Sequence, residues 1–278
     1  MAHPIYSKKN RTRTRARTQA FFRAFEDLLE QFGPDKVAAL PTILPEDVSR
    51  LADIIEVYRR YGYPGLFLRP VNYQGFARSL LTPTADDGPA LWAKGVEILQ
   101  AALQEGHPPL REFGLETALR RIFSPNHTAH VDLRSPNPAA RDTLLVDYDG
   151  TFYPSDEARM LARQGVADLS LGNLRKGLDG ERVNALTWSQ MADVHEDCLH
   201  CVHLPWCGID GVDDVSWHGR SDLPKRGSHF CRYHRAVFDF IFSTLLGGDP
   251  NRLSFLAFHL TGVPETLPFF GPFRYDAA

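Results

Sequence analysis

The 278-residue chain is poor in cysteine, has little excess charge and contains no long apolar run. Its four cysteines all lie at or after Cys198, and its formal net charge of −3 favours no particular class of partner. No apolar run reaches the ~18 residues that a membrane-spanning helix needs. The basic N-terminal residues are not followed by the apolar core of a signal peptide. We therefore expect a soluble cytoplasmic protein without a membrane partner, and the hydrophobic content of 43% suffices for a sizeable core.

The N-terminal segment, residues 1–18, alternates basic residues with threonine and has no apolar face. Such a run is typical either of an arm that binds nucleic acid or an acidic partner, or of a solvated leader. No aromatic or groove-reading element accompanies it. We therefore predict a disordered leader and no nucleic-acid partner.

Apolar residues recur at helical spacing in several segments, and one short apolar run interrupts them. The expected helices are 19–32, 45–61, 90–105, 110–123, 181–193 and 232–246. Residues 65–68 form an apolar run that Pro70 closes, which is typical of a buried parallel strand. Residues 82–89 read as a loop. Helix, short strand and loop in succession indicate βα units, so the fold class is α/β to α+β.

The second half of the chain contains a predicted hairpin. Residues 144–148 and 151–154 are expected strands, and Asp149-Gly150 between them is a strong two-residue turn. Ser155 then suits the N-cap of a helix. The remaining strand candidates are 129–133 and 169–171, the latter followed by a turn at 172–173.

The cysteines follow the pattern C-x2-C-x5-C-x23-C, in Cys198, Cys201, Cys207 and Cys231. Four thiolates gathered in this way can close a tetrahedral zinc site or hold a [4Fe–4S] cluster. For zinc, nearby histidines are competing ligands; these are His200, His203, His229 and His234. Three other interpretations explain the spacing less well. They are four inert buried cysteines, disulfides and a redox C-x-x-C pair.

The hairpin and the cysteine loop together resemble a known extension of radical SAM peptide maturases, the SPASM domain. The residues that carry the likeness are Asp149-Gly150-Thr151-Phe152-Tyr153-Pro154, the following stretch Ser155-Asp156-Glu157-Ala158-Arg159-Met160-Leu161, Leu171-Gly172-Asn173, and the C-x2-C-x5-C triad. The second stretch is similar to the His-Xaa-Ser system maturases of the HxsB type. Residues 65–70 and 75–77 resemble late segments of their barrel, and the likeness covers roughly residues 45–245.

The resemblance implies one cluster and no independent radical chemistry. Ser155 and Gly211 stand where the family has ligands of a first auxiliary cluster, so that cluster should be absent. The ligands of the other cluster match the four cysteines, which implies one [4Fe–4S] cluster. Radical SAM enzymes bind S-adenosylmethionine through a C-x3-C-x2-C loop, and no cysteine precedes Cys198. The chain is also too short to hold the early barrel strands, so we expect no S-adenosylmethionine binding by this chain alone.

The expected organisation follows from these parts. Residues 1–18 are the leader, 19–128 a helical, partial βα barrel region, 129–246 a SPASM-like iron–sulfur domain, and 247–278 a C-terminal tail. Asp156, Glu157 and Arg159 are candidates for contacts to a substrate or barrel partner; the alternative is an exposed capping turn with an internal ion pair. No catalytic residue is assigned.

The expected function is that of an iron–sulfur component in the maturation of ribosomally made peptides. It would work with a precursor peptide and a radical SAM protein, and its cluster would relay electrons or brace a loop-rich domain. The alternative is a zinc-stabilised module, without redox activity, that binds proteins or peptides.

Overall fold

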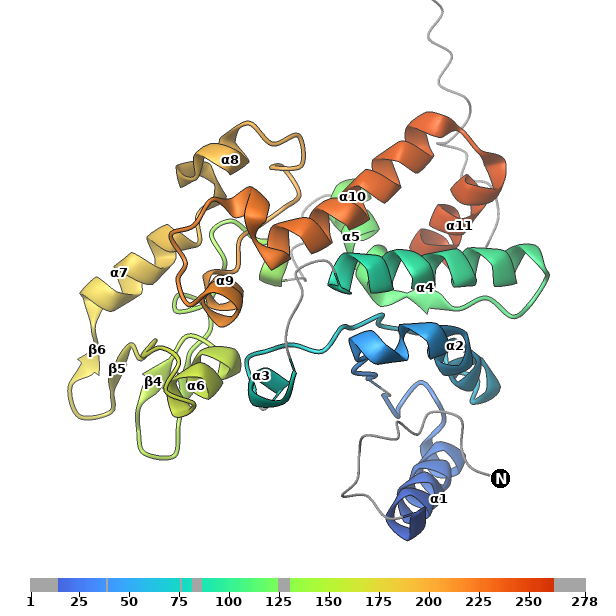
Figure 1. Ribbon diagram of the computed structural model, residues 1–278, viewed down its shortest axis with the longest axis horizontal. Coiled ribbons are helices and arrows are strands. Elements are labelled where there is room, and N and C mark those ends of the chain that lie inside the picture. Colours follow the sequence, from blue (N-terminus) through green and yellow to red (C-terminus); the bar gives the residue numbers. More distant parts are fainter. Residues whose placement is uncertain (1–14, 39, 76, 82–86, 125–130, 263–278) are drawn as a thin grey trace, which may run out of the picture. The chain divides into compact units, whose positions relative to one another are not determined.

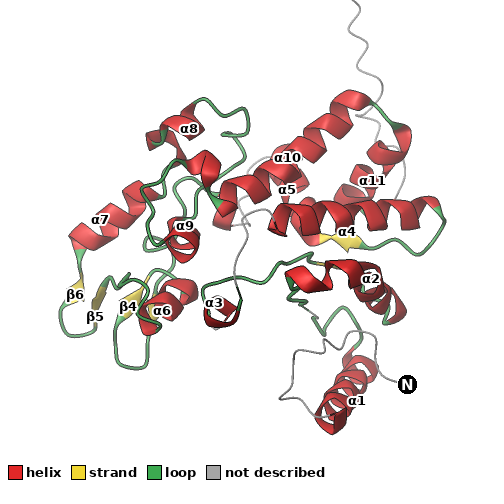
Figure 2. Cartoon of the chain, viewed as in Figure 1, coloured by secondary structure: helices red, strands yellow, loops and turns green. Residues whose placement is uncertain are grey.

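The computed structural model describes residues 15–38, 40–75, 77–81, 87–124 and 131–262. Helices dominate, and every strand is short (Figure 2). The chain divides into two compact units that are discontinuous in sequence. The first unit comprises Met1–Pro70, Ala90–Glu116 and Ser243–Ala278, and the second comprises Val71–Pro89 and Thr117–Phe242. Among the helices described, none combines the length and apolarity needed to span a bilayer.

The first unit contains one parallel strand pair and several helices, of which α1, α2, α4 and α11 are labelled in Figure 1. Strands β1 (Gly65–Leu66) and β2 (Arg111–Glu112) pair in parallel, with Leu66 opposite Glu112. This pairing confirms the first two residues of the parallel strand predicted at 65–68; residues 67–68 are not part of it. The helices are α1 (Arg15–Phe32), the 3-10 helix η1 (Pro45–Arg50), α2 (Leu51–Arg60), α4 (Asp87–Gln104) and α11 (Pro250–Thr261).

The buried polar groups of Glu112 and His259 in the first unit find their partners within the protein. The Glu112 carboxylate is fully buried and accepts hydrogen bonds from four N–H groups, those of Leu68, Trp92 Nε1, Gly114 and Leu115. The backbone N–H of Glu112 donates to Nε2 of the buried His259, 2.9 Å away. Nδ1 of His259 then donates to the Phe255 carbonyl at 2.8 Å. Both ring nitrogens are thus satisfied, which fixes the neutral tautomer.

Two sequence predictions need correction in this unit. Residues 15–18, predicted as leader, belong to α1; residues 1–14 lie outside the described residues. The apolar side of α1 stays open, with Phe21 58% exposed. Residues 250–261, predicted as tail, form α11, because Asp249 caps its N-terminus through Arg252 N–H and Gly262, at φ +79°, ends it.

Two predicted boundaries also shift. The helix predicted from residue 110 begins at Phe113, as α5 (Phe113–Phe123), because Arg111 and Glu112 are taken into the strand pair. The loop predicted at 82–89 ends earlier, since Asp87 already begins α4, whereas residues 82–86 lie outside the described residues. The first shift comes from strand pairing rather than from local propensity.

The second unit is built from short elements and loops. They are α3 (Ala77–Leu80), η2 (Val131–Leu133), β3 (Leu145–Val146), β4 (Phe152–Tyr153), α6 (Asp156–Arg163), β5 (Gly172–Asn173), β6 (Gly177–Leu178), α7 (Gly180–Ser189), η3 (Ala192–Val194), α8 (Glu196–Leu199), α9 (Gly211–His218), η4 (Lys225–Gly227) and α10 (His229–Gly247). Most of α5 and of α10 also belongs to this unit. Its apolar core is divided into small clusters, one of which joins α6 to α9 through Leu161 and Val212.

The predicted hairpin is confirmed. Strands β3 and β4 pair antiparallel, with Val146 opposite Phe152. Gly150 adopts φ +83°, but Asp149 does not have a positive φ. The Asp147 N–H donates to the Thr151 carbonyl and the Gly150 N–H donates to the Asp147 carbonyl, so the loop has three residues, 148–150, instead of the predicted two. Ser155 caps α6 by accepting a hydrogen bond from the Ala158 N–H. The cap confirms the predicted role of Ser155.

Two strand predictions differ from the structure. Residues 131–133 of the predicted strand 129–133 form the 3-10 helix η2, while 129–130 lie outside the described residues. Their carbonyls meet the chain at Gly208 instead of a neighbouring strand. The strand predicted at 169–171 does not form; residues 172–173, predicted as a turn, form β5 instead and pair with β6.

Candidate metal centre

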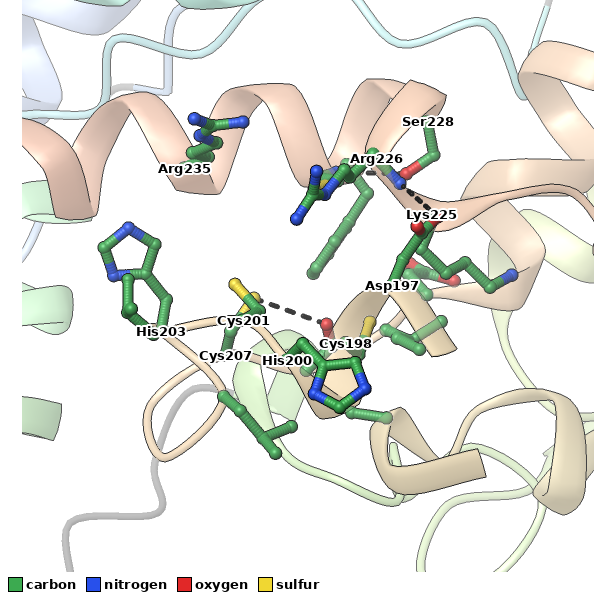
Figure 3. A pocket seen from close by; sticks show the side chains of 18 of the residues that line it. Asp197, Cys198, His200, Cys201, His203, Cys207, Lys225, Arg226, Ser228 and Arg235 are labelled. Atoms are coloured by element: carbon green, nitrogen blue, oxygen red, sulfur yellow. Dashed lines mark hydrogen bonds between the residues drawn. The ribbon is translucent and has the colours of Figure 1, made fainter. Parts of the chain in front are cut away.

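The four cysteines line one pocket of about 230 Å³ in the second unit (Figure 3). Cys198 lies on α8, Cys201 and Cys207 lie in the turns that follow it, and Cys231 lies in the first turn of α10. All four are half-buried and free of disulfides. The structure thus brings together every cysteine of the sequence at one place.

Successive tight turns bend the chain around the pocket. The Cys201 N–H donates to the Cys198 carbonyl at 3.0 Å, and the Leu204 N–H donates to the Cys201 carbonyl at 3.1 Å. The Cys207 N–H then donates to the His203 carbonyl at 3.0 Å. This geometry is what the sequence predicts for a C-x-x-C turn followed by a bend.

A glycine lets the cysteine loop approach another backbone segment. A Cβ atom on Gly208 would lie 2.5 Å from the Arg134 carbonyl oxygen and 2.7 Å from that of Asp132. Backbone atoms cannot move aside as a flexible side chain can. Gly208 is therefore required for the path of the chain directly after Cys207.

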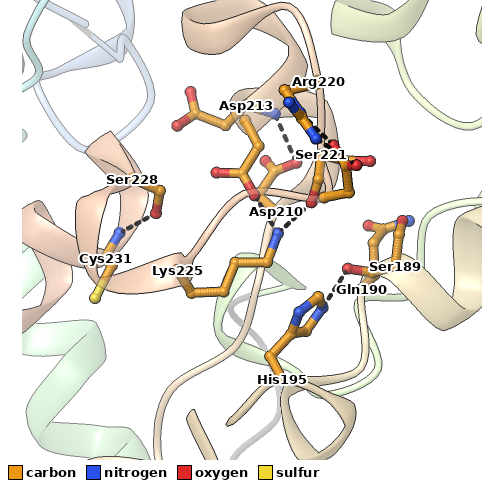
Figure 4. A network of polar contacts seen from close by, with 12 residues as sticks. Ser189, Gln190, His195, Asp210, Asp213, Arg220, Ser221, Lys225, Ser228 and Cys231 are labelled. Carbon is orange, nitrogen blue, oxygen red and sulfur yellow. Dashed lines mark hydrogen bonds and ion pairs between the residues drawn. The ribbon is translucent and has the colours of Figure 1, made fainter. Parts of the chain in front are cut away.

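The start of α10 favours a negatively charged group at Cys231. Ser228, which is 2% exposed, accepts a hydrogen bond from the Cys231 N–H at 3.1 Å (Figure 4). The N-terminal end of a helix carries partial positive charge and stabilises thiolates and other anions nearby. The cap and the helix end together suit Cys231 to be an anionic ligand.

Side-chain contacts connect the two cysteine-bearing segments. The Asp197 carboxylate, next to Cys198, accepts a hydrogen bond from the Arg226 N–H at 3.2 Å. Lys225 is buried and pairs with the buried Asp214 at 2.6 Å, and its ammonium also donates to the Ser221 carbonyl (Figure 4). Sequence reasoning did not identify this ion pair, since no local pattern marks it. It fixes the segment that leads into α10.

Burial favours the protonated form of three of the thiols, those of Cys198, Cys207 and Cys231. Burial above all, with a smaller effect of the neighbouring cysteines, raises the pKa of Cys198 to about 11 and that of Cys207 to about 12. Burial and Cys201 also raise the pKa of Cys231. A thiolate is the form that binds metals. Loading this pocket therefore requires a cation strong enough to displace the thiol protons.

The thiols surround a space rather than a point. Within the described ranges, no three His, Cys, Asp or Glu side chains are grouped closely enough to hold a metal ion. In a zinc site each sulfur lies about 2.3 Å from the ion. Four such contacts would require the thiols to lie closer together than they do in this structure. The donor set of four thiols fits an iron–sulfur cluster.

Asp156, Glu157 and Arg159 lie on α6 and do not line the pocket. Arg159 pairs with Asp156 one turn earlier and with the buried Asp147 at 3.7 Å. These ion pairs are internal to the unit. A role of the three residues toward a substrate or partner stays a prediction.

Asp147 and Arg163 form a stronger pair that sequence reasoning missed. The Arg163 guanidinium donates to the Asp147 carboxylate, and this hydrogen bond holds the pKa of Asp147 below its usual range. Arg163 also donates to the Tyr148 hydroxyl at 2.8 Å. The pair ties α6 to the hairpin.

Comparison with known proteins gives a structural likeness without a sequence match. No protein-family model matches the chain, and no curated protein matches it. Structures of anSMEcpe, an anaerobic sulfatase-maturing enzyme of the radical SAM and SPASM class, resemble it.

The histidine-tagged enzyme with bound AdoMet gives a TM-score of 0.56 at 16% identity, covering 86% of this chain and 62% of that chain. The native enzyme with AdoMet gives 0.55 at 15% identity, covering 81% and 61%. The native enzyme with AdoMet and the Kp18Cys peptide gives 0.54 at 13% identity, covering 83% and 62%.

The likeness is one of fold. The mixed helical architecture with small sheets is similar to that of a radical SAM enzyme across most of this chain. The chain spans about three fifths of the length of those structures, 61–62%. The activity and partners of those enzymes therefore do not carry over to this chain from the likeness alone.

Proposed function

We propose that the chain is an iron–sulfur component of a radical SAM peptide-maturation system, in which Cys198, Cys201, Cys207 and Cys231 hold one [4Fe–4S] cluster. The observation that carries the proposal is the convergence of all four cysteines on one pocket. The fold likeness to a radical SAM and SPASM enzyme supports it independently. A cubane uses four thiolate ligands, which is the number that the chain offers.

Residues 129–246 would be the SPASM-like domain and 19–128 a partial barrel, similar to the HxsB-type maturases. The Asp149–Gly150 hairpin, the Ser155-capped helix and the cysteine loop support this division. The first auxiliary cluster of that family would be missing, because Ser155 caps a helix and Gly211 begins α9.

The chain's own residues would shape the centre in three ways. The thiolates bind it, and the burial around Cys207 keeps water away. The helix N-terminus at Cys231 stabilises its negative charge. When bound, a fully ligated cluster supplies one-electron transfer or braces the loops that hold it.

Catalysis would need a further component. Cleavage of S-adenosylmethionine requires a three-cysteine loop, and all four cysteines of this sequence are used elsewhere. That loop has to come from outside these 278 residues. The partners would be a radical SAM protein and a precursor peptide; two similar structures contain peptides, Kp18Cys and Cp18Cys. A compartment that keeps thiols reduced, such as the cytoplasm, fits the free cysteines.

Anaerobic reconstitution tests the proposal. The purified chain should take up about four irons and four sulfides and turn brown. The same sample should produce no 5′-deoxyadenosine from S-adenosylmethionine, even with a strong reductant. Multiple turnovers that Cys198→Ala abolishes would show that this cluster itself binds S-adenosylmethionine.

A second candidate is a structural zinc ion in a non-redox interaction module. The observation in its favour is the same set of four thiols, which is also a complete zinc donor set. One zinc per chain with no sulfide after reconstitution would favour this candidate and overturn the cluster. A zinc protein would also be colourless.

A further inference from the structure

A short segment from the first half of the sequence packs into the second unit. Residues 71–75 belong to that unit, although most of it comes from the second half of the chain. Tyr73 is 2% exposed and Gln74 is 5% exposed, so both side chains are buried there. The side-chain amide of Gln164, directly after α6, donates to the Gln74 carbonyl at 2.6 Å. We call residues 71–75 the strap, because a distant part of the chain holds them in place.

The Asp213 carboxylate on α9 joins the strap to the start of α10. Its Oδ1 accepts a hydrogen bond from Nε2 of Gln74, 3.2 Å away. Its Oδ2 lies 3.3 Å from Nδ1 of His229, the first residue of α10. The side chains of Asp213 and His229 are only 13% and 14% exposed. One largely buried side chain is thus bonded to two segments that lie far apart in the sequence.

Ring contacts form a second path between the same two segments. Tyr73 and Trp217 meet edge to face, with ring centroids 4.7 Å apart. Trp217 in turn stacks on the His229 imidazole, with centroids 4.0 Å apart and ring planes 15° from parallel. Aromatic pairs of this kind stabilise a contact beyond the burial of their area. Because Trp217 also lies on α9, this helix connects the strap to His229 twice.

The segment that receives these contacts carries one of the four cysteines. Cys231 is two residues after His229, in the same first turn of α10, and it lines the cysteine pocket. The first N–H groups of a helix have no partner within the helix, and helix ends open easily. Ser228 holds this turn from within, since its hydroxyl accepts the Cys231 N–H and its carbonyl accepts the Arg232 N–H. The strap holds the same turn from outside.

Helix α9 borders the pocket as well. Asp210 lines the pocket and caps α9, accepting hydrogen bonds from the N–H groups of Val212 and Asp213 (Figure 4). Tyr73 and Gln74 do not line the pocket themselves. The strap therefore reaches the cysteines only through α9 and the start of α10.

We propose that the strap positions the cysteine pocket. Tyr73 and Gln74 are positioning residues, which act through α9 to hold the first turn of α10 and, with it, Cys231. The contacts within the chain carry this inference, and only its consequence for a bound centre rests on the proposed function. Since coupling between two sites is reciprocal, filling the pocket should also hold the strap more tightly.

Hydrogen exchange of the full chain, purified without a bound centre, tests the inference. Gln74→Glu keeps the shape of the side chain but removes the donor to Asp213. The Cys231 and Arg232 amides, both bonded to Ser228, should then exchange about fivefold faster, as expected from the loss of one hydrogen bond of ordinary strength. The amides of α7, in the same unit, should exchange as in the wild type.

A pair exchange provides the rescue. Adding Asp213→Asn to Gln74→Glu restores a donor and an acceptor between the two positions, so most of the protection should return. Gln31→Glu is the matched control, because it makes the same change at an exposed position of α1. It should leave the exchange of the Cys231 and Arg232 amides unchanged.

Variants of Tyr73 make the same comparison if Gln74→Glu does not fold. Tyr73→Leu removes the ring that meets Trp217 and should also speed the exchange of the first turn of α10. Tyr73→Phe should match the wild type, because the Tyr73 hydroxyl has no hydrogen-bond partner among the described residues. Unchanged exchange in both Gln74→Glu and Tyr73→Leu would overturn the inference. Equal acceleration throughout the second unit would also overturn it, since that result means a general loss of stability.

Loading with iron and sulfide separates this inference from the proposed function. If the wild type takes up about four irons, trypsin should cleave more slowly after Arg78, which follows the strap and donates to the Ser216 carbonyl on α9. Iron uptake with unchanged cleavage after Arg78 would overturn the inference and leave the cluster intact. No iron uptake, together with faster exchange in Gln74→Glu, would support the strap and refute the cluster.

Discussion

The best-buried polar cluster of each unit is completed in a different way. In the first unit, the Glu112 carboxylate and both nitrogens of His259 find hydrogen-bond partners in the protein. In the second unit, four thiols line one pocket, and Nδ1 of the buried His203 has no hydrogen-bond partner within the described ranges. The first arrangement is complete without a ligand. The second has donor atoms that a metal centre would satisfy.

The two units should also differ in which condition lowers their stability, acid or the loss of a metal. The first unit depends on groups whose protonation is fixed by burial, as the lowered pKa of His259 shows. The second depends on thiols that must lose protons before a metal binds. Metal removal should therefore affect the second unit, and acid should affect the first through His259.

The largest effect is expected from Cys201→Ala. The variant should lose the cluster and, with it, the order of residues 195–231, because metal binding and local folding are coupled. The helices of the first unit should persist, since they bury their own apolar faces. Iron and sulfide analysis and limited proteolysis measure the two effects. His200→Ala is the control, and identical cleavage of variant and wild type around 195–231 would contradict the expectation.

Lys225→Met should destabilise the second unit by about 3–5 kcal/mol, because it leaves the buried Asp214 carboxylate without its cation. Urea unfolding at neutral pH measures the change. Lys176→Met, at an exposed turn, should stay within about 0.5 kcal/mol of the wild type. Equal midpoints for the two variants would show that the buried pair contributes nothing.

The pH dependence of the first unit should report His259. Burial lowers the pKa of His259 to about 4 from 6.5. The unfolded chain therefore binds a proton before the folded chain does, and stability falls as pH drops from about 6.5 to 4. The full loss is about 3 kcal/mol. His259→Gln should remove this part of the slope in urea titrations, whereas His107→Gln, which is exposed, should leave it unchanged.

The smallest effect is expected from Ser228→Ala. Loss of the hydrogen bond to the Cys231 N–H should cost about 1 kcal/mol, as for other helix caps, with metal-binding stoichiometry kept. Thermal unfolding measures the change, and Ser228→Thr should restore most of it. If Ser228→Ala bound no metal at all, Ser228 would be needed to position Cys231 for metal binding and would not act only as a helix cap.

Local signals explain which parts of the fold could be predicted. The helices, the hairpin and the Ser155 cap depend on residues close in sequence, and they form. Two helices differ from their predicted ranges, since residues 45–50 make a 3-10 helix and the helix predicted at 181–193 ends at Ser189. Residues 131–133 form a 3-10 helix close to Gly208, far along the chain, which no local signal records. The apolar periodicity of α1 likewise predicts a helix, but not that Phe21 is 58% exposed.

The sequence by itself determined which residues are the candidate ligands, since the spacing of Cys198, Cys201, Cys207 and Cys231 predicts a metal centre. Only the tertiary structure decided what lies around those cysteines. Lys225 meets Asp214 across 11 residues, and His203 meets Asp239 across 36. No periodicity or motif records such pairs, because they form only when α9 packs against η4 and the cysteine loop packs against the middle of α10.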